Sequence, residues 1–360
     1  MLNLKPETFG LDISDLSLKF VKLKKKKKFF DLASYGEAPI KPGVIRNGEI
    51  RDEKSLVKII ENSLAKVKGE KLKTKYVIAS LPEERAFLQV IQLPKMTEED
   101  LKSAVIYEAE NYIPLPIEEV YLDFQIVKPV SNHLDHLDVL IAALPKKIVD
   151  SYLSCLKQAG LKPKALEIES LAISRAVIKE GLSNAPVLLI DFGATRTSFI
   201  IFSGYSLLFT SSIPISSQQI TEAISKAMKV DLAQAEKLKI EYGLQLRPKN
   251  KEIQDATTPI LIDLAGQIRK HIDYYKNHPF HEHLPSSQRS LEKILLCGGG
   301  ANLRGLTDFL SSEIRLPAEI ANPLVNISAN SPKYKFQLSP DQSLSYVTAL
   351  GLALRGFQET

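Results

Sequence analysis

The sequence has little cysteine and no long apolar run. Only two of its 360 residues are cysteines, Cys155 and Cys297, and each lies in an apolar segment. This usage excludes a disulfide framework, offers no paired-cysteine zinc motif and favours reduced thiols in the cytosol. No stretch approaches the roughly 18 continuous apolar residues of a membrane span. The start, "MLNLKPETFG", does not resemble a signal peptide. We therefore expect a cytoplasmic protein that meets a membrane only through a partner.

Several familiar enzyme signatures are also missing. There is no G-x-x-x-x-G-K-[ST] loop, no G-x-G-x-x-G fingerprint and no G-x-S-x-G elbow. These absences argue against a P-loop NTPase, a Rossmann dehydrogenase and an α/β-hydrolase. The net charge is only +5, and much of it comes from one run, "KLKKKKKFF" at 22–30, so nucleic-acid binding is not indicated. This run predicts a solvated hairpin tip, and a patch for anionic lipid headgroups is the alternative.

The order of the predicted elements indicates an internal duplication. Residues 8–38 alternate strand and turn three times, and residues 185–215 repeat this pattern. After the first repeat come a helix with Asp52 as its N-cap and a buried strand at 75–82 of the kind found inside a parallel sheet. A length of 360 residues then predicts two lobes, each built on a similar mixed sheet.

The remaining segments are predicted to be an insertion and a set of helices. Residues 85–164 read as a small α+β unit. In the second half, one helix ends at Gly243, and another is predicted to begin at Thr258 and Pro259, because proline suits the first helical turn. The segment 345–357 predicts a last helix with a face of small residues.

Two aspartates are the leading candidates for chemistry. Asp12 and Asp191 each end the first strand of a predicted hairpin, and two such hairpins facing one another could hold a triphosphate and its metal. The second hairpin, "DFGATRT" at 191–197, adds a glycine for close backbone approach and two hydroxyl donors. Three glycines at 298–300 lie between a strand and a helix start. Taken singly, each motif can also be explained as an ordinary tight turn without a binding role.

In this order the motifs resemble those of the actin-like ATPase superfamily. "GLDISDLSLK" and "LLIDFGATRTSFI" resemble its two phosphate loops, and "KILLCGGGANLRGL" resembles its adenosine loop. "EIESLAISRAVI" and "VTALGLALRG" resemble its two connecting helices, and "AEKLKIEYG" its ribose contact. Within the superfamily, the inserted "NYIPLPIEEVYLDFQIV" and the segment "CGGGANLRGLTDFLSSEI" are similar to the branch formed by FtsA and the PilM family of type IV pilus proteins.

The resemblance implies an α/β protein with the actin-like ATPase fold. This fold has two lobes of duplicated mixed sheets with flanking helices, and a small inserted α+β subdomain, IC. The implied subdomain limits are IA at 1–84, 165–185 and 337–360, IC at 85–164, IIA at 186–214 and 285–336, and IIB at 215–284.

The resemblance also implies ATP and Mg²⁺ as cofactors, with a role for each matching residue. Asp12 and Asp191 would lie beside the metal, and Glu169 would orient the hydrolytic water, so Glu169 and Asp191 are the catalytic candidates. The other implied contacts are Ser14, Ser17, Lys19, Gly193, Thr195 and Thr197 at the phosphates, Glu236 and Lys239 at the ribose, and Gly298, Gly299 and Gly300 at the adenine.

The implied function is an ATP-binding scaffold of type IV pilus assembly at the inner face of the cytoplasmic membrane. Its implied partner is the N-terminal cytoplasmic tail of a PilN-like membrane protein, docked in a groove involving IA and IC. Nucleic acid is not expected, and self-association is left open. The alternatives are an FtsA-like division protein, although no amphipathic tail follows "LALRGFQET", a type II secretion scaffold, and a small-molecule kinase of the same superfamily.

The first phosphate loop departs from the pattern of its relatives. Ser14 stands where relatives have glycine, and Asp15 stands where they have a hydroxyl residue. A Cβ at position 14 hinders close backbone approach, and a carboxylate at position 15 would repel a triphosphate. We therefore expect Asp15 to point to solvent, and nucleotide binding to come with weak or absent hydrolysis.

Overall fold

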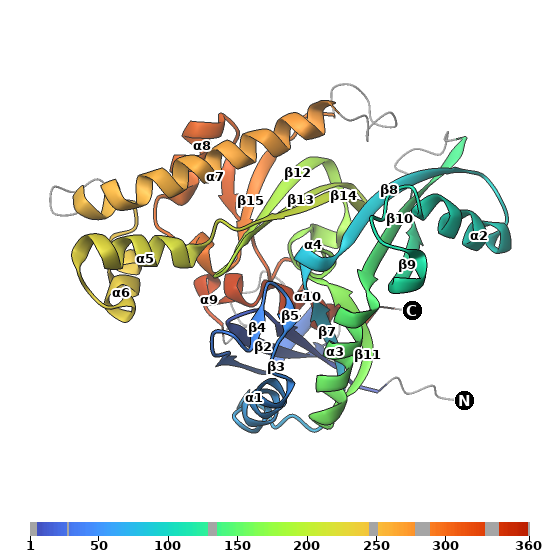
Figure 1. The fold of residues 1–360 in the computed structure, drawn as a ribbon, viewed down its shortest axis with the longest axis horizontal. Coiled ribbons are helices and arrows are strands. Elements are labelled where there is room, and N and C mark those ends of the chain that lie inside the picture. Colours follow the sequence, from blue (N-terminus) through green and yellow to red (C-terminus); the bar gives the residue numbers. More distant parts are fainter. Residues whose placement is uncertain are drawn as a thin grey trace.

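The computed structural model describes residues 6–26, 29–128, 135–244, 251–277, 289–327 and 338–358. In this part of the chain, two lobes each enclose a mixed β-sheet, and a smaller third sheet lies beside them (Figure 1). The predicted α/β class and the two-lobed arrangement are confirmed. Cys155 and Cys297 are buried free thiols, as predicted.

The first sheet has the strand order β11-β7-β1-β2-β3-β6. The predicted triple of strands forms an antiparallel meander, and β7 inserts in parallel between β1 and β11. This placement confirms the prediction that segment 75–82 is an inner parallel strand. The strands are β1 (Phe9–Ile13), β2 (Ser17–Lys26), β3 (Phe29–Pro39), β6 (Lys68–Gly69), β7 (Tyr76–Leu81) and β11 (Lys162–Ile168).

The second sheet repeats the order of the first. Its order is β14-β13-β12-β15-β16, in which an antiparallel meander is again extended by parallel strands on the side of its first strand. The predicted duplication is therefore present at the level of topology. The strands are β12 (Ser183–Phe192), β13 (Thr197–Gly204), β14 (Ser206–Ile213), β15 (Lys293–Cys297) and β16 (Ala318–Ile320).

The third sheet forms most of the insertion. Its order is β8-β10-β9, and α2 packs on it through Leu101 and Val105 (Figure 1). The next helix, α3, leaves this sheet and packs against α1 of the first lobe. The elements are β8 (Phe87–Pro94), α2 (Glu98–Ala109), η2 (Ile117–Glu119), β9 (Val120–Ile126), β10 (His136–Pro145), α3 (Lys146–Gln158) and α1 (Glu53–Ala65).

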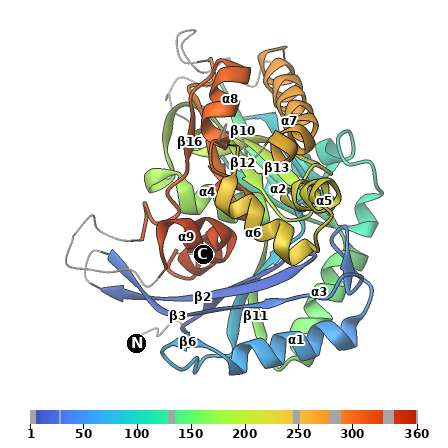
Figure 2. The same ribbon diagram turned by 90° about the vertical axis from the view of Figure 1, so that its left-hand side faces the viewer.

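Helices cover both faces of the first sheet. Figure 2 shows α1 on one face and α9 with the C-terminal helix on the other. Asp52 caps α1 as predicted, since its carboxylate accepts a hydrogen bond from the backbone N–H of Ser55. On the opposite face, α4 (Glu169–Val177) and α10 (Val347–Arg355) pack together above β1 and contact each other along the small-residue face of α10.

One predicted helix start is wrong. Helix α7 begins at Lys251, so Pro259 lies inside it and not at its first turn. The helix continues because Ile253 and Thr257 are buried against the lobe, and the hydroxyl of Thr258 donates to the Gln254 carbonyl at 2.7 Å. The second-lobe helices are α5 (Ser217–Met228), α6 (Leu232–Tyr242), α7 (Lys251–Asn277), η6 (Gly299–Asn302) and α8 (Leu306–Ile314).

A buried ion network holds the C-terminal helix to the first sheet. Glu167 at the end of β11 has a side chain only 2% exposed, and its Oε1 lies 2.5 Å from Arg175 of α4 and 2.8 Å from Arg355 of α10. The single carboxylate therefore joins three elements. The remaining short elements are β4 (Ile45–Arg46), β5 (Glu49–Ile50), η1 (Glu83–Arg85), η3 (Lys179–Gly181) and α9 (Pro340–Ser345).

Candidate functional site

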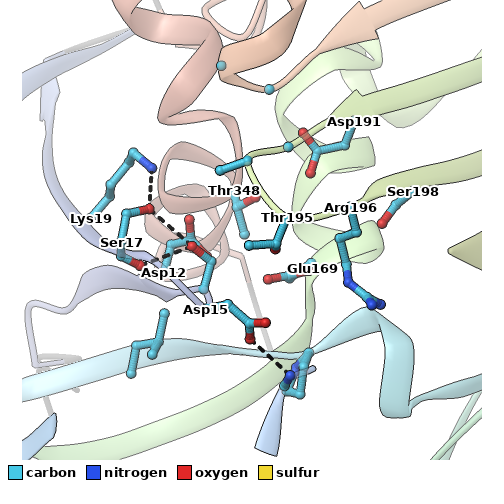
Figure 3. Close-up of a pocket in the computed structure, with 18 of the residues that line it drawn as sticks. Asp12, Asp15, Ser17, Lys19, Glu169, Asp191, Thr195, Arg196, Ser198 and Thr348 are labelled. Atoms are coloured by element: carbon cyan, nitrogen blue, oxygen red, sulfur yellow. Dashed lines mark hydrogen bonds between the residues drawn. The ribbon is translucent and has the colours of Figure 1, made fainter. Parts of the chain in front are cut away.

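A cavity of about 140 Å³ lies between the two lobes, where the two hairpins face each other (Figure 3). Residues of β1, β2 and α4 line it from the first lobe, and the β12–β13 hairpin and the glycine loop after β15 line it from the second. The cavity brings together most of the residues predicted from the sequence. These are Asp12, Ser14, Ser17, Lys19, Glu169, Asp191, Gly193, Thr195, Gly298 and Gly299.

The first loop is a tight turn held by its own hydroxyls. The backbone N–H of Ser14 donates to the Ser17 carbonyl at 2.9 Å, and the Ser14 hydroxyl donates to the same oxygen at 3.1 Å. The ammonium of Lys19 donates to the Ser17 hydroxyl at 2.8 Å (Figure 3). Asp12 is buried beside this turn and accepts a hydrogen bond from Ser80 of β7 at 3.1 Å. The loop thus places one ammonium and one carboxylate at the cavity wall.

The prediction that Asp15 points to solvent is wrong. Its carboxylate accepts hydrogen bonds from the backbone N–H groups of Asn47 and Gly48, at 2.8 and 3.0 Å, and Asp15 lines the cavity. The turn between β4 and β5 supplies these donors, because both of its residues have positive φ and direct their N–H groups to one acceptor. The carboxylate therefore anchors this turn to the first loop.

Predicted glycines lie in the second hairpin turn and in the loop after β15. The backbone N–H of Gly193 donates to the Arg196 carbonyl at 2.9 Å and closes the hairpin turn. Gly298 has φ +81°, and a Cβ there would lie 2.2 Å from Oδ1 of Asp191. A Cβ on Gly300 would meet the Phe192 carbonyl oxygen at 2.7 Å. The glycine loop after β15 therefore fits tightly around the end of β12 and leaves the Asp191 carboxylate at the cavity.

Thr197 does not line the cavity. Its side chain is fully buried, and its hydroxyl donates to the Ile215 carbonyl at 2.7 Å. The alternation of a β-strand explains this outcome, because residues next to each other in β13 face opposite sides of the sheet. Ser198 lines the cavity in its place. We therefore remove Thr197 from the set of phosphate contacts.

A second, more open cavity of about 470 Å³ adjoins the first and shares Ala194 and Gly299 with it. Glu236, Lys239 and Gly300 of the predicted set line this cavity. The Lys239 ammonium lies 2.7 Å from the Glu236 carboxylate and donates to hydroxyls of α5. These hydroxyls belong to Ser217 and Thr221, two cavity residues that sequence reasoning missed.

Burial controls the charge of the carboxylates in the first cavity. It raises the pKa of the Asp191 carboxyl to about 7, with the Asp12 charge adding to the rise and Lys19 opposing it. Burial also raises the pKa of Glu169 well above its usual range, and the charges of Asp12 and Glu84 add to this effect. The pKa of Asp12 is raised by burial and lowered by Lys19 and by the Ser80 hydrogen bond. These shifts favour the protonated carboxyls, and a cation bound between the carboxylates would oppose the shifts.

The residues of this cavity fit a magnesium nucleotide. In the described part of the chain, no group of three or more His, Cys, Asp or Glu side chains is arranged to hold a metal by itself. Mg²⁺ ordinarily takes one or two protein carboxylates and completes its shell with phosphate and water, and Asp12 and Asp191 supply two. Gly298 packs closely against the Asp191 carboxylate, which lines the cavity.

The raised pKa of Asp191 predicts how stability varies with pH. An aspartate of ordinary pKa, near 3.8, releases its proton before one with a pKa of about 7 does. Between these values the folded protein binds more protons than the unfolded chain, so stability decreases as pH rises. We expect thermal unfolding of the ligand-free proteins from pH 4 to 7 to show a less favourable change of stability with pH in the wild type than in Asp191→Asn. Equal pH slopes for both proteins would contradict the assignment.

The fold and the cavity together define the class of the protein. Duplicated mixed sheets, two hairpins facing an interlobe cavity and a glycine loop at its rim constitute the actin-like ATPase fold. The same fold is seen in MreB 5 of Spiroplasma citri bound to AMPPNP, with TM-score 0.57 and 13% identity over 96% of this chain and 95% of that one.

The chain belongs to the family of the type IV pilus assembly protein PilM, which it matches over residues 10–357. A solved PilM–PilN type IV pilus biogenesis complex contains a chain that is 29% identical, with TM-score 0.80, 99% of this chain covered and 100% of that chain covered. Cell division protein FtsA of Enterococcus hirae is 24% identical over 341 residues, which are 85% of this chain and 75% of FtsA.

Proposed function

We propose that this protein is an ATP-binding scaffold of type IV pilus assembly. In this proposal the protein lies at the inner face of the cytoplasmic membrane and binds the N-terminal cytoplasmic tail of a PilN-like protein. This tail is the only link between the protein and the membrane. The observation that carries the proposal is the likeness to the PilM–PilN complex over 99% of this chain. Of the helices that the structure describes, none is long and apolar enough to span a bilayer.

The proposed nucleotide lies across the two adjoining cavities. Glu236 and Lys239 hold the ribose in the second cavity, where Gly299 and Gly300 border the base. Gly298 lines only the first cavity, at the phosphate end. In the first cavity, Lys19 and the loop hydroxyls bind the phosphates, and Asp12 and Asp191 hold Mg²⁺. The metal supplies positive charge between these carboxylates and the phosphates. The loop hydroxyls that contact the phosphates belong to Ser14, Ser17 and Thr195, and Gly193 allows the second loop to approach them.

We propose that hydrolysis is weak or absent. Glu169 is the residue placed to orient a water, but burial raises the pKa of its carboxyl well above the usual range. A raised pKa favours the protonated carboxyl, which accepts a proton from water poorly, so this shift weakens the group that would align the water. Bound nucleotide then serves to set the lobe arrangement, and turnover is not required for that role.

The proposed site for the PilN-like tail is a groove beside β9. This groove has a volume of about 310 Å³ and lies where the edge strand β9 of the third sheet meets α4 and the strands of the second lobe. An edge strand can pair with an extended peptide, and apolar side chains beside it can bind alternate residues of that peptide. The apolar residues that line this groove include Ile126, Leu140, Leu171, Phe202 and Leu207.

A peptide titration tests the partner proposal. Ile126 is 43% exposed on β9 and lines the groove, so Ile126→Asp places a charge where an apolar contact is proposed. We expect a synthetic N-terminal peptide of the PilN-like protein to bind the wild type, and the variant to bind it about tenfold more weakly or worse. Ile320→Asp is the matched control, since Ile320 is 45% exposed on β16 of the second lobe. Absence of peptide binding to the wild type would refute the partner, and equal binding to both variants would refute the groove.

The subdomain limits remain a proposal, with one amendment. Because β11 pairs with β7 and α3 packs on α1, we propose that subdomain IC ends near residue 145 and that IA resumes there. The limits proposed for IIA and IIB are unchanged.

A further inference from the structure

Arg196 occupies an unusual place at the tip of the β12–β13 hairpin. Its side chain is 19% exposed and, like Glu169, lines the first cavity (Figure 3). One terminal nitrogen, Nη1, donates to the Ser212 hydroxyl of β14 at 3.1 Å. Among the described residues, its buried Nε has no hydrogen-bond partner. A guanidinium is rarely buried with an unsatisfied donor, so this arrangement suggests that a ligand supplies the missing acceptor.

The nearest charge to Arg196 belongs to the other lobe. Oε1 of Glu84, in η1, lies 3.3 Å from Nε, and its side chain is 12% exposed. This distance gives an ion pair across the cleft without the geometry of a hydrogen bond. Burial raises the pKa of the Glu84 carboxyl, Arg196 opposes this rise, and the charges of Asp15 and Glu83 add to it. The pair is therefore a poorly formed contact between two side chains that each face the cavity.

The cavity geometry indicates which part of a nucleotide Arg196 would meet. The two cavities share Ala194 and Gly299, so a nucleotide with its ribose at Glu236 passes this junction before its phosphates enter the first cavity. Arg196 and Glu84 line only the first cavity. They therefore face the phosphate end of the ligand, farthest from the base.

The charges in the first cavity point to the same ligand group. Lys19 and Arg196 are the two cationic side chains among its lining residues, and Lys19 already donates to Ser17 in the first loop. The carboxylates that line it are Asp12, Asp15, Glu84, Glu169 and Asp191. A terminal phosphate entering this acidic space gains most from a guanidinium with a donor still available, because arginine binds phosphate oxygens through two or more N–H groups.

We propose that Arg196 recognises the terminal phosphate of the bound nucleotide, exchanging its contact with Glu84 for that phosphate. The protein then distinguishes a nucleoside triphosphate from a diphosphate through this residue. The exchange also replaces an interlobe ion pair by a contact to the ligand, so the two states differ in how the lobes are joined. This inference rests on the proposed function and adds the residue that gives the cleft its specificity.

Calorimetric titration of ATP and ADP, each with Mg²⁺, tests the proposal with variants of opposite effect. We expect Arg196→Met to weaken ATP binding about 10- to 100-fold, as expected for a lost hydrogen bond to a charged group, and to change ADP binding less than about twofold. Glu84→Gln removes the competing carboxylate and should strengthen ATP binding alone. Arg196→Lys should restore part of the loss. Arg269→Met, at an arginine 45% exposed on α7, is the matched control and should change neither affinity.

A second variant protects the test from misfolding. Arg196→Met leaves Glu84 buried without its cation, whereas Arg196→Met with Glu84→Gln removes both charges and should show the same selective loss of ATP binding. Suppose that the wild type binds both nucleotides. If the variants then lose ATP and ADP affinity equally, or lose neither, the inference is overturned and the proposed function stands. A wild type that binds neither nucleotide would overturn the proposed function and the inference with it.

Discussion

Replacing Gly351 by alanine is expected to lower the free energy of unfolding by about 3 kcal/mol or more, a cost at the upper end for overpacking a core. Gly351 lies on α10 where this helix crosses α4, and a Cβ there would be 1.8 Å from the carbonyl oxygen of Ala172. No rotamer change relieves this contact, because the obstacle is backbone. The helices must separate, which disturbs the core that they form above β1.

The matched control is the same substitution on another helix. Gly266 lies within α7, and a Cβ there would meet nothing within 4 Å. Alanine forms helix better than glycine by roughly 0.5–1 kcal/mol, so Gly266→Ala should raise stability slightly. Urea unfolding of the three proteins measures both effects. A Gly351→Ala variant as stable as the wild type would show that the two helices pack less closely than the structure indicates.

Replacing Gly298 by alanine is expected to weaken Mg·ATP binding by at least about tenfold, which corresponds to about 1.4 kcal/mol. The added Cβ would lie 2.2 Å from Oδ1 of Asp191 and 2.8 Å from the Phe192 carbonyl oxygen. Asp191 must then turn away from the position at which it is proposed to hold Mg²⁺. Calorimetric titration with Mg·ATP measures the effect.

Gly160 provides the control for backbone strain. It has φ +74°, close to the φ of +81° at Gly298, but a Cβ on it would meet nothing within 4 Å. Both alanine variants carry the left-handed penalty of about 1 kcal/mol, so both should lose some stability. Only Gly298→Ala should lose nucleotide affinity. Equal affinities in the two variants would show that the Asp191 position does not matter for the ligand.

Much of the fold could be predicted because its strongest signals are local. The first strand of each hairpin, β1 or β12, carries an aspartate next to its last residue, and this repeated pattern indicates where each sheet begins. The N-cap at Asp52 was also predictable, since a side-chain acceptor before an amphipathic stretch starts a helix. The start of α7 was not, because burial of its first turns outweighs the local effect of Pro259.

The candidate site was less predictable where a role depends on a distant segment. Asp15 anchors the turn at Asn47 and Gly48, more than thirty residues away, and no pattern around position 15 indicates this. Arg196 stands inside a quoted motif, but its importance depends on Glu84 across the cleft. Thr197 was predicted to be a phosphate contact because the motif contains it. Strand alternation instead directs its side chain into the core.

The network around Glu167 has a consequence for the order of events during synthesis. The carboxylate at the end of β11 meets Arg355, 188 positions later in the chain, and a Cβ on Gly10 would touch the backbone of Ala349 and Ala353. The first lobe therefore cannot complete its core until nearly the whole chain has left the ribosome. Contacts of such high sequence separation slow folding and leave apolar surface exposed meanwhile. We expect the nascent first lobe to depend on chaperones, while the second lobe, whose sheet strands span residues 183–320, can assemble before the last helix emerges.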